Sequence, residues 1–235
     1  MKYKTYLDGL IPKVDHSSDD HLNNDILDQI KERCSDILKI YKKSKRYIYR
    51  GLNFTTENFI KPATKDRKTI GTSPEIQKIY DDYLEAKFGW RPKSRGFFCV
   101  GKLTIADGWN DYVYIVFPIN GTKFIWSSLV NDFYGYIMSG INSKLTSDIL
   151  QLENNWNLFA KSTITGSARE SLIKNIEYML KPILATYRDD DILKAIRSNH
   201  EIVFNNDRGY YIIMIDYFKK YRDLLLNDRG SSDEI

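Results

Sequence analysis

The stretch YVYIVFPINGTKFIWS, residues 112–127, decides the fold class of this chain. Residues 112–117 are β-branched and aromatic, which is typical of a buried strand. Pro118-Ile119-Asn120-Gly121 then predicts a turn, and residues 123–127 are expected to be the hairpin partner of the first strand. Hairpins favour an α+β protein over a doubly wound parallel sheet.

Helix and strand patterns on both sides of this stretch complete the fold prediction. Residues 18–45 carry apolar side chains at helical spacing and predict one long amphipathic helix. Ser73 and Pro74 are typical of a helix start. Further elements are expected as follows: strands at 46–52, 97–100, 201–204 and 210–215, and helices at 74–88, 167–182 and 189–196.

These elements predict an α+β fold with a defined domain organisation. We expect the central strands to split into two small antiparallel or mixed sheets around a cleft. A chain of 235 residues is compatible with a single domain. Within it we expect an amino-terminal helical cap over residues 1–45, an α+β core over 46–218, and a carboxy-terminal tail over 219–235 whose last residues, 229–235, are disordered.

Composition indicates a protein of a reducing compartment. The chain has no run of eighteen apolar residues and no apolar amino-terminal segment of the secretory type, so we expect neither a membrane span nor export. Cys34 and Cys99 form no disulfide framework, and with three scattered histidines they predict no metal site. We therefore expect a cytoplasmic location, in a bacterial cell or an infected host. The heavy use of Lys, Ile and Asn is typical of AT-rich bacterial and bacteriophage genomes.

Positive charge is concentrated in one part of the sequence. Residues 31–102 contain 18 basic and 8 acidic residues, whereas the whole chain has a net charge of only +4. The remainder of the chain is therefore net negative. A basic segment of this kind can bind the phosphates of a nucleotide or a nucleic acid, or it can form an ordinary solvated surface.

Three short features could carry chemistry, in a chain without a Walker A, GxGxxG, HExxH or GxSxG motif. The first is Arg50-Gly51 at a strand end, which suits an anionic ligand close to the backbone. The second is Glu201, which begins an apolar strand and shares a strand face with Asn199, so that both side chains could point into one cleft. The third is the strand and turn over residues 97–102. Read alone, each feature also fits ordinary packing.

Taken together and in this order, the features resemble the ADP-ribosyltransferase fold of the arginine–serine–glutamate class. In that family a first-strand arginine, a mid-chain strand with a hydroxyl motif and a late-strand glutamate surround NAD. The resemblance extends from about residue 46 to residue 217. It implies NAD as substrate and a macromolecular acceptor, protein or nucleic acid.

The resemblance also implies roles for individual residues. Arg50 would bind the NAD phosphates or ribose, Gly51 would meet the nicotinamide carboxamide through its backbone, and Glu201 would stabilise positive charge as the glycosidic bond breaks. Phe97, Phe98 or Tyr112 would stack on nicotinamide.

Two positions depart from the family pattern. Residues 99–101 contain no hydroxyl, so Ser127 with its neighbour Ser128 is the nearest alternative to the serine motif. Asn199 stands two residues before the glutamate, where members that modify arginine or asparagine side chains often carry Glu or Gln. Arginine-directed transfer is therefore not implied.

Two non-catalytic hypotheses compete with the transferase. One is a nucleic-acid-binding or virion-associated accessory protein that uses the basic segment 31–102 with its interleaved aromatic residues. The other is an accessory protein that acts through a partner.

Overall fold

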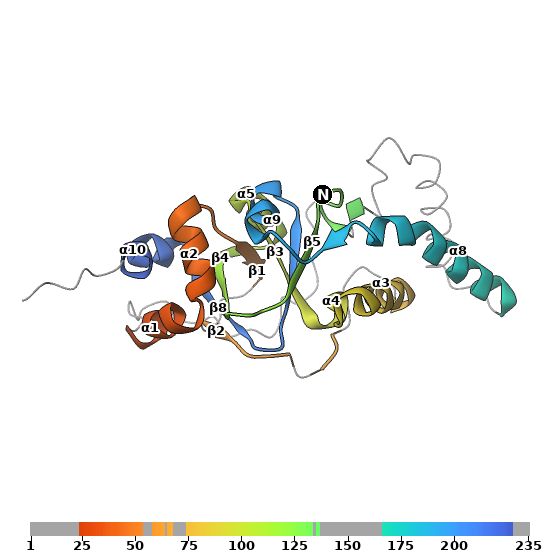
Figure 1. The fold of residues 1–235 in the computed structure, drawn as a ribbon, viewed down its shortest axis with the longest axis horizontal. Coiled ribbons are helices and arrows are strands. Elements are labelled where there is room, and N and C mark those ends of the chain that lie inside the picture. Colours follow the sequence, from red (N-terminus) through yellow and green to blue (C-terminus); the bar gives the residue numbers. More distant parts are fainter. Residues whose placement is uncertain are drawn as a thin grey trace, which may run out of the picture.

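The centre of the molecule is an eight-stranded antiparallel sheet with helices around it (Figure 1). The computed structural model describes residues 24–53, 58–63, 65–67, 74–133, 135–136 and 166–227. The strand order is β2-β8-β4-β1-β3-β7-β5-β6. The strands are β1 (Tyr49–Leu52), β2 (Phe59–Ile60), β3 (Gly96–Val100), β4 (Tyr112–Pro118), β5 (Phe124–Ser127), β6 (Tyr187–Arg188), β7 (Glu201–Asn205) and β8 (Tyr210–Met214).

The eight helices of the described residues complete the α+β class that the sequence predicted. They are α1 (Asn24–Arg33), α2 (Ser35–Ser44), α3 (Pro74–Phe88), α4 (Pro92–Arg95), α5 (Leu103–Trp109), α8 (Ser167–Leu184), α9 (Ile192–Ser198) and α10 (Ile215–Leu226).

The expected split into two small sheets is wrong, because one continuous sheet links all eight strands. The link between its two halves is nevertheless narrow. β1 pairs with β4 at four successive positions, but its register with β3 is the single pair Tyr49 opposite Val100. β3 instead pairs along its whole length with β7. The strands β1 and β3 therefore diverge directly after Tyr49, at the position of Arg50.

The sheet is strongly curved around this junction. Phe97 on β3 stacks on Tyr210 of β8 with ring centroids 3.8 Å apart, although β1 and β4 lie between these strands in the sheet. In a flat sheet, strands three places apart are separated by about 14 Å. The curvature therefore brings the two halves together on the concave side, where Phe204 also stacks on Phe97 at 5.3 Å.

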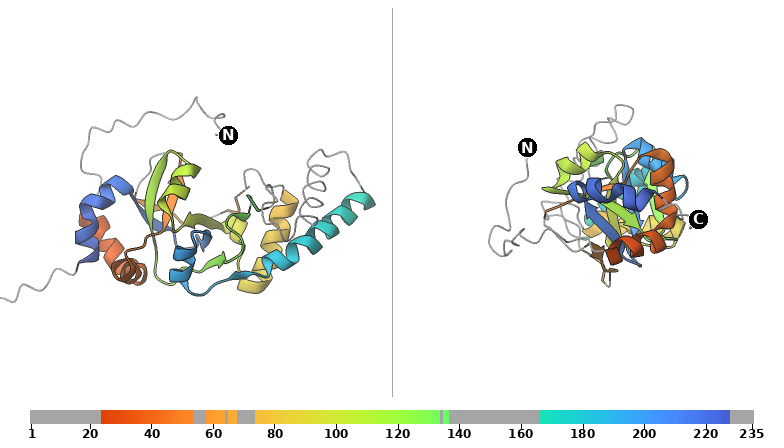
Figure 2. Two further views of the ribbon diagram at one scale, coloured as in Figure 1. Left: turned by 90° about the horizontal axis from the view of Figure 1, so that it is seen from above. Right: turned by 90° about the vertical axis from the view of Figure 1, so that its left-hand side faces the viewer.

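Helices α1, α2 and α10 lie at one end of the molecule, and α3 and α8 lie at the other (Figure 2). α2 and α10 pack on the half of the sheet that contains β4 and β8, where Tyr41 donates a hydrogen bond to the Val116 carbonyl. α3 and α8 pack together over the half that contains β3, β7 and β5, around Tyr80, Leu84 and Leu180. The functional residues described below lie between these two helical groups.

The single helix expected over residues 18–45 is two helices, and residues 18–23 lie outside the described part of the chain. The break falls at Cys34, where the turn after β4 meets the helices. The backbone of Asn120 donates to the Arg33 carbonyl at 2.7 Å, and its side-chain oxygen accepts from the Asp36 N–H at 3.0 Å. These contacts from a distant turn satisfy backbone groups that a continuous helix would use internally.

The predicted hairpin of residues 112–127 is only half correct. The strand 112–117 is confirmed as β4, but β5 pairs with β7 and β6 instead of β4. The turn between them docks against the α1–α2 break through Asn120, so the chain leaves β4 without folding back on it. β5 then joins the far half of the sheet.

Two further boundaries differ from the sequence prediction. α8 continues through Pro182 to Leu184, which is fully buried beyond the expected end. The expected tail 219–235 contains most of α10, because Phe218, Leu225 and Leu226 give this segment an apolar face that packs on the sheet. Residues 229–235, like Ser73, lie outside the described part of the chain. No helix within the described residues is long and apolar enough to cross a membrane.

Candidate functional site

Glu201 is a buried carboxylic acid at the start of β7. Its side chain is only 6% exposed, and its backbone N–H donates to the Asn131 carbonyl at 2.7 Å. Its position opposite Val100 on β3 directs the side chain toward the face of the sheet that α3 and α8 cover. The Oε1 atom of Glu201 is buried and has no hydrogen-bond partner. An unsatisfied buried acid is costly, which makes it a candidate for function.

A buried ammonium group lies beside this acid. Lys93 is 6% exposed, and its Nζ lies over the rings of Phe98, Phe133 and Tyr80 at 5.0, 5.3 and 5.7 Å. The short helix α4, with Pro92 in its first turn, fixes the backbone of Lys93. Three aromatic faces stabilise a cation that is otherwise shielded from water.

The fully buried Asp81 of α3 holds α4 in place. Its Oδ1 accepts from the Lys93 N–H at 2.6 Å, and its carboxylate also accepts from the N–H and the hydroxyl of Ser94. These donors are the free N–H groups of the first turn of α4. Asp81 thus connects α3 with the element that carries Lys93.

Burial favours the neutral form of Glu201. Burial raises the pKa of Glu201 to about 8; the Lys93 ammonium opposes this shift, and Asp132 adds to it both by its charge and by a side-chain hydrogen bond. Burial lowers the pKa of Lys93. A hydrogen bond between two carboxyl groups requires that one of them carries a proton. The Glu201–Asp132 pair therefore holds a proton at neutral pH.

Arg67 lies close to the same cluster. Its backbone N–H donates to the Ser94 carbonyl and its Nε to the Lys93 carbonyl, while its guanidinium lies 4.5 Å from the centre of the Phe98 ring. Burial lowers the pKa of Arg67 to about 10, the charge of Arg50 lowers it further, and the charge of Glu201 acts in the opposite direction. Arg67 is therefore near both of the residues that the sequence analysis selected.

Arg50 occupies the place where β1 and β3 diverge. Its Nη1 donates to the Phe98 carbonyl at 2.9 Å, and its guanidinium lies near the rings of Phe97 and Tyr210 at 5.9 and 6.0 Å. Its Nε is buried and has no hydrogen-bond partner. The divergence of β1 and β3 after Tyr49 gives the guanidinium its position beside the Phe98 carbonyl.

Arg50 and Glu201 leave the sheet on opposite faces. Tyr49, Val100 and Glu201 lie in one cross-strand row, so their side chains share a face, and Arg50 follows Tyr49 by one position. The structure thus places the two predicted residues on β1 and β7, on either side of β3, without direct contact between them. Arg67 is the group that connects them electrostatically.

Gly51 is required for packing. A Cβ at this position would lie 2.4 Å from the Ala106 carbonyl oxygen of α5, and the Gly51 carbonyl accepts from Asn110 Nδ2 at 2.8 Å. The Gly51 carbonyl therefore makes a contact within the protein, in place of the predicted contact with the nicotinamide carboxamide.

The predicted aromatic residues divide between core and site. Phe97 is 2% exposed in the stack with Tyr210 and Phe204, whereas the half-buried Phe98 lies beneath Arg67 and Lys93. Tyr112 is half-buried at the start of β4, opposite Leu52. Phe98 is thus the ring that lies among the charged groups.

Ser127 and Asn199 are held by local structure. The Ser127 hydroxyl is fully buried, bonds to Thr186 Oγ1 at 2.7 Å, and accepts from the N–H groups of residues 129 and 130. Asn199 caps α9 in the left-handed conformation, with φ of 61°. The strand alternation that was expected to align Asn199 with Glu201 does not extend to it, because β7 begins at Glu201.

Sequence reasoning missed Arg67, Lys93 and Asp132. Arg67 lies in a segment that reads as a polar loop and Lys93 in a basic turn, and no element was predicted around Asp132. All three meet Glu201 only through the tertiary fold. The one available signal was the basic turn of residues 90–96, which contains Lys93.

The described residues contain no group of three or more His, Cys, Asp and Glu side chains placed to hold a metal ion. The sequence matches no protein-family model, and comparisons with curated proteins and with solved structures give no match.

Proposed function

We propose that this protein is an ADP-ribosyltransferase that takes ADP-ribose from NAD and transfers it to a macromolecular acceptor. One observation supports this proposal above the others. Arg50 and Arg67 are close enough for one to lower the pKa of the other, and they lie beside a strand, β3, whose other neighbour begins with the buried acid Glu201. An anion-binding pair and a carboxylate on the two strands that flank β3, with Arg67 close to both, suit a dinucleotide substrate.

The two guanidinium groups have the properties of a pyrophosphate site. Two nearby cations repel each other, and a bridging anion converts that repulsion into two sets of charge-assisted hydrogen bonds. The buried Arg50 Nε, which has no partner, supplies one donor for such an anion. Phe98, beneath Arg67, provides an aromatic face beside the phosphates.

Glu201 would act on the nicotinamide ribose. When the bond between the ribose C1′ and nicotinamide breaks, positive charge develops on the sugar, and a fixed carboxylate in a poorly hydrated place stabilises it. Only the ionised form of Glu201 can do this. Since burial raises the pKa of Glu201 to about 8, the proposal requires an enzyme that works best in mildly alkaline solution.

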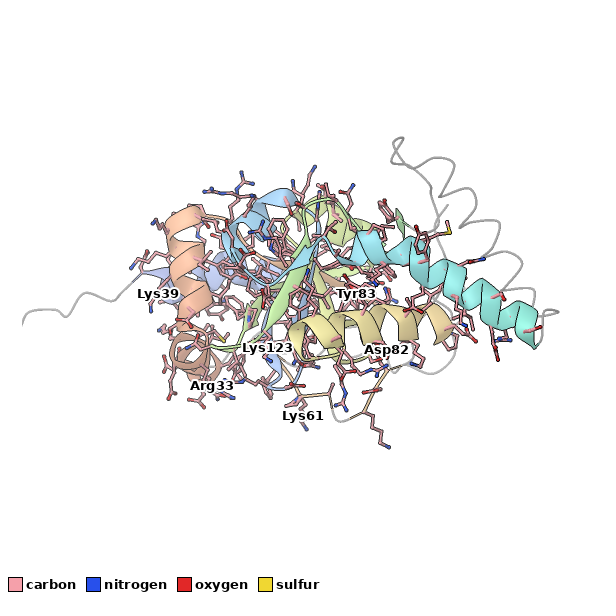
Figure 3. All side chains as sticks on the ribbon, turned by 45° about the vertical axis from the view of Figure 1, so that its right-hand side comes forward. Arg33, Lys39, Lys61, Asp82, Tyr83 and Lys123 are labelled. Carbon is pink, nitrogen blue, oxygen red and sulfur yellow. The ribbon has the colours of Figure 1, made fainter. Side chains whose placement is uncertain are left out.

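The basic segment 31–102 supports nucleic acid as a partner or acceptor. Arg50, Arg67 and Lys93 of this segment point into the structure, whereas basic residues near the end of α2 are exposed. Figure 3 shows Lys39 on α2, at the end of the molecule away from Asp82 and Tyr83 of α3. The exposed residues near the end of α2 are Lys39, Lys42, Lys43, Lys45 and Arg46. Such a group suits phosphate contacts whose strength falls with salt concentration.

Labelled NAD tests the enzymatic proposal. The protein is incubated with a cell lysate and NAD labelled in its adenylate phosphate, and protein and nucleic acid fractions are then examined for label. Wild type should label a macromolecule and release nicotinamide. Arg67→Ala should weaken NAD binding by about tenfold to a hundredfold, the value of one charge-assisted contact. Arg197→Ala, an exposed arginine in the last turn of α9, is the matched control. Absence of both label and nicotinamide release refutes the proposal.

If the protein binds nucleic acid without transferring ADP-ribose to it, the protein should retain labelled RNA or DNA in a filter assay at low salt, and no label should be transferred from NAD. Affinity should then fall steeply between low and physiological salt concentration. This outcome favours the non-catalytic alternative.

A further inference from the structure

The side chain of Asp132 hydrogen-bonds to Glu201, and its surroundings differ from those of Glu201. Asp132 is half-buried, whereas Glu201 is 6% exposed. The Asp132 Oδ2 accepts the Gly135 N–H at 3.0 Å, which fixes the direction of the carboxylate. One carboxyl group of this pair is buried and the other is nearer solvent. The two can therefore have different roles, one toward the sugar and the other toward the nucleophile.

The loop that carries Asp132 is anchored on both sides of it. Asn131 accepts the backbone N–H of Glu201, and Phe133 is fully buried against Tyr80, with ring centroids 4.3 Å apart. These contacts keep Asp132 next to Glu201 independently of the charge on either acid. The fold itself therefore places the two carboxyl groups side by side.

We propose that Asp132 is the general base that removes a proton from an oxygen nucleophile, so that ADP-ribose is transferred to water or to a hydroxyl group of the acceptor. This inference rests on the proposed function. The nucleophile oxygen forms a bond to the ribose C1′ while its proton passes to the Asp132 carboxylate. The bond from C1′ to the pyridinium nitrogen breaks, and its electron pair stays on nitrogen, so nicotinamide leaves as a neutral molecule.

No general acid is needed in this reaction, because the leaving group is already cationic before the bond breaks. Both carboxyl groups can therefore act as anions, Glu201 toward the sugar and Asp132 toward the nucleophile. The charged groups that face the pair are Lys93 and Arg67, and their two positive charges compensate the second negative charge when the shared proton is lost. Asp81 also acts on Lys93 through its charge, and it accepts the backbone N–H of Lys93.

A base that deprotonates a nucleophile becomes unnecessary when the nucleophile carries no proton. Azide is such a nucleophile at neutral pH. Asp132→Ala should slow nicotinamide release in water by about a hundredfold or more. Added azide should restore most of the rate in Asp132→Ala and should leave the wild-type rate nearly unchanged, with azido-ADP-ribose found by mass spectrometry.

Controls separate this role from a structural one. Asp107→Ala, an exposed aspartate on α5, should retain wild-type release. Thermal unfolding and NAD affinity of Asp132→Ala and of the isosteric Asp132→Asn establish that fold and substrate binding persist. Azide rescue is a readout that a loss of packing would not produce.

The outcomes distinguish the two proposals. If wild type releases nicotinamide and folded Asp132→Ala releases it within about threefold of that rate, Asp132 is not the base, although the transferase stands. If Asp132→Ala is slow, binds NAD and is not rescued by azide, the base assignment is also overturned. If wild type releases no nicotinamide, the proposed function fails and this inference fails with it.

Discussion

Replacing Glu201 by glutamine should make the protein more stable at neutral pH. In the folded protein the pKa of Glu201 is raised from 4.5 to about 8, so the folded state binds a proton that the unfolded chain has released at pH 7. The stabilising contribution of this group is complete below its unfolded pKa and is lost as pH rises toward the folded one. Glutamine is neutral at every pH and avoids that loss.

The size of the effect follows from linkage. Each pH unit between the two pKa values changes the free energy of unfolding by about 1.4 kcal/mol, so wild type should lose about 3 kcal/mol relative to Glu201→Gln between pH 5 and pH 7. The loss should end above about pH 8, where folded Glu201 ionises as well. The lowered pKa of Lys93 acts with the opposite sign, so the difference between the two proteins isolates Glu201.

Urea unfolding of both proteins at several pH values measures this difference. Glu177→Gln, an exposed glutamate on α8, serves as the matched control and should remain parallel to wild type at every pH. A constant difference between Glu201→Gln and wild type across this range would refute the reasoning, because it would mean that Glu201 is ionised in the folded state.

Three other predictions follow from the same contacts. Nicotinamide release should rise with pH to a midpoint near 8, and Asp132→Asn should move that midpoint down, since Asp132 raises the pKa of Glu201; an unchanged midpoint would contradict the pairing. Asp81→Ala should lower the free energy of unfolding by about 3 kcal/mol in urea titrations, because it leaves buried donors of α4 without an acceptor, whereas Asp82→Ala, at its half-buried neighbour, should cost at most about 1 kcal/mol. Gly51→Ala should cost about 1–3 kcal/mol through the contact with α5, and a neutral result would show that the helix can move away.

Local sequence signals predicted most individual elements but not their partners. The strand at 112–117 and the start of α3 at Pro74 were both predicted correctly, because each depends on residues within one turn or strand. The helix expected from residue 189 begins only at Ile192, with Asp191 as its N-cap. The break at Cys34 depends on Asn120, which is more than eighty residues away, and the partner of β5 depends on where that turn docks. No periodicity contains such information.

The candidate site shows the same limit. Arg50 and Glu201 could be selected because a charged residue beside an apolar strand is unusual. Arg67 and Lys93 occur in polar segments where charge is expected, and Asp132 is a single acid in the stretch after β5. The sequence therefore contained no sign that the three come together around Glu201. The opposite faces of Arg50 and Glu201 follow from the register of β1, β3 and β7, which sequence alone does not supply.

A crystal structure of Glu201→Gln soaked with NAD tests the central claim most directly. The account predicts pyrophosphate oxygens bonded to Arg50 and Arg67, with the nicotinamide ribose toward residue 201 and Asp132. Electron density for NAD elsewhere on the molecule, with these two arginines unchanged and without contact to phosphate, would contradict it.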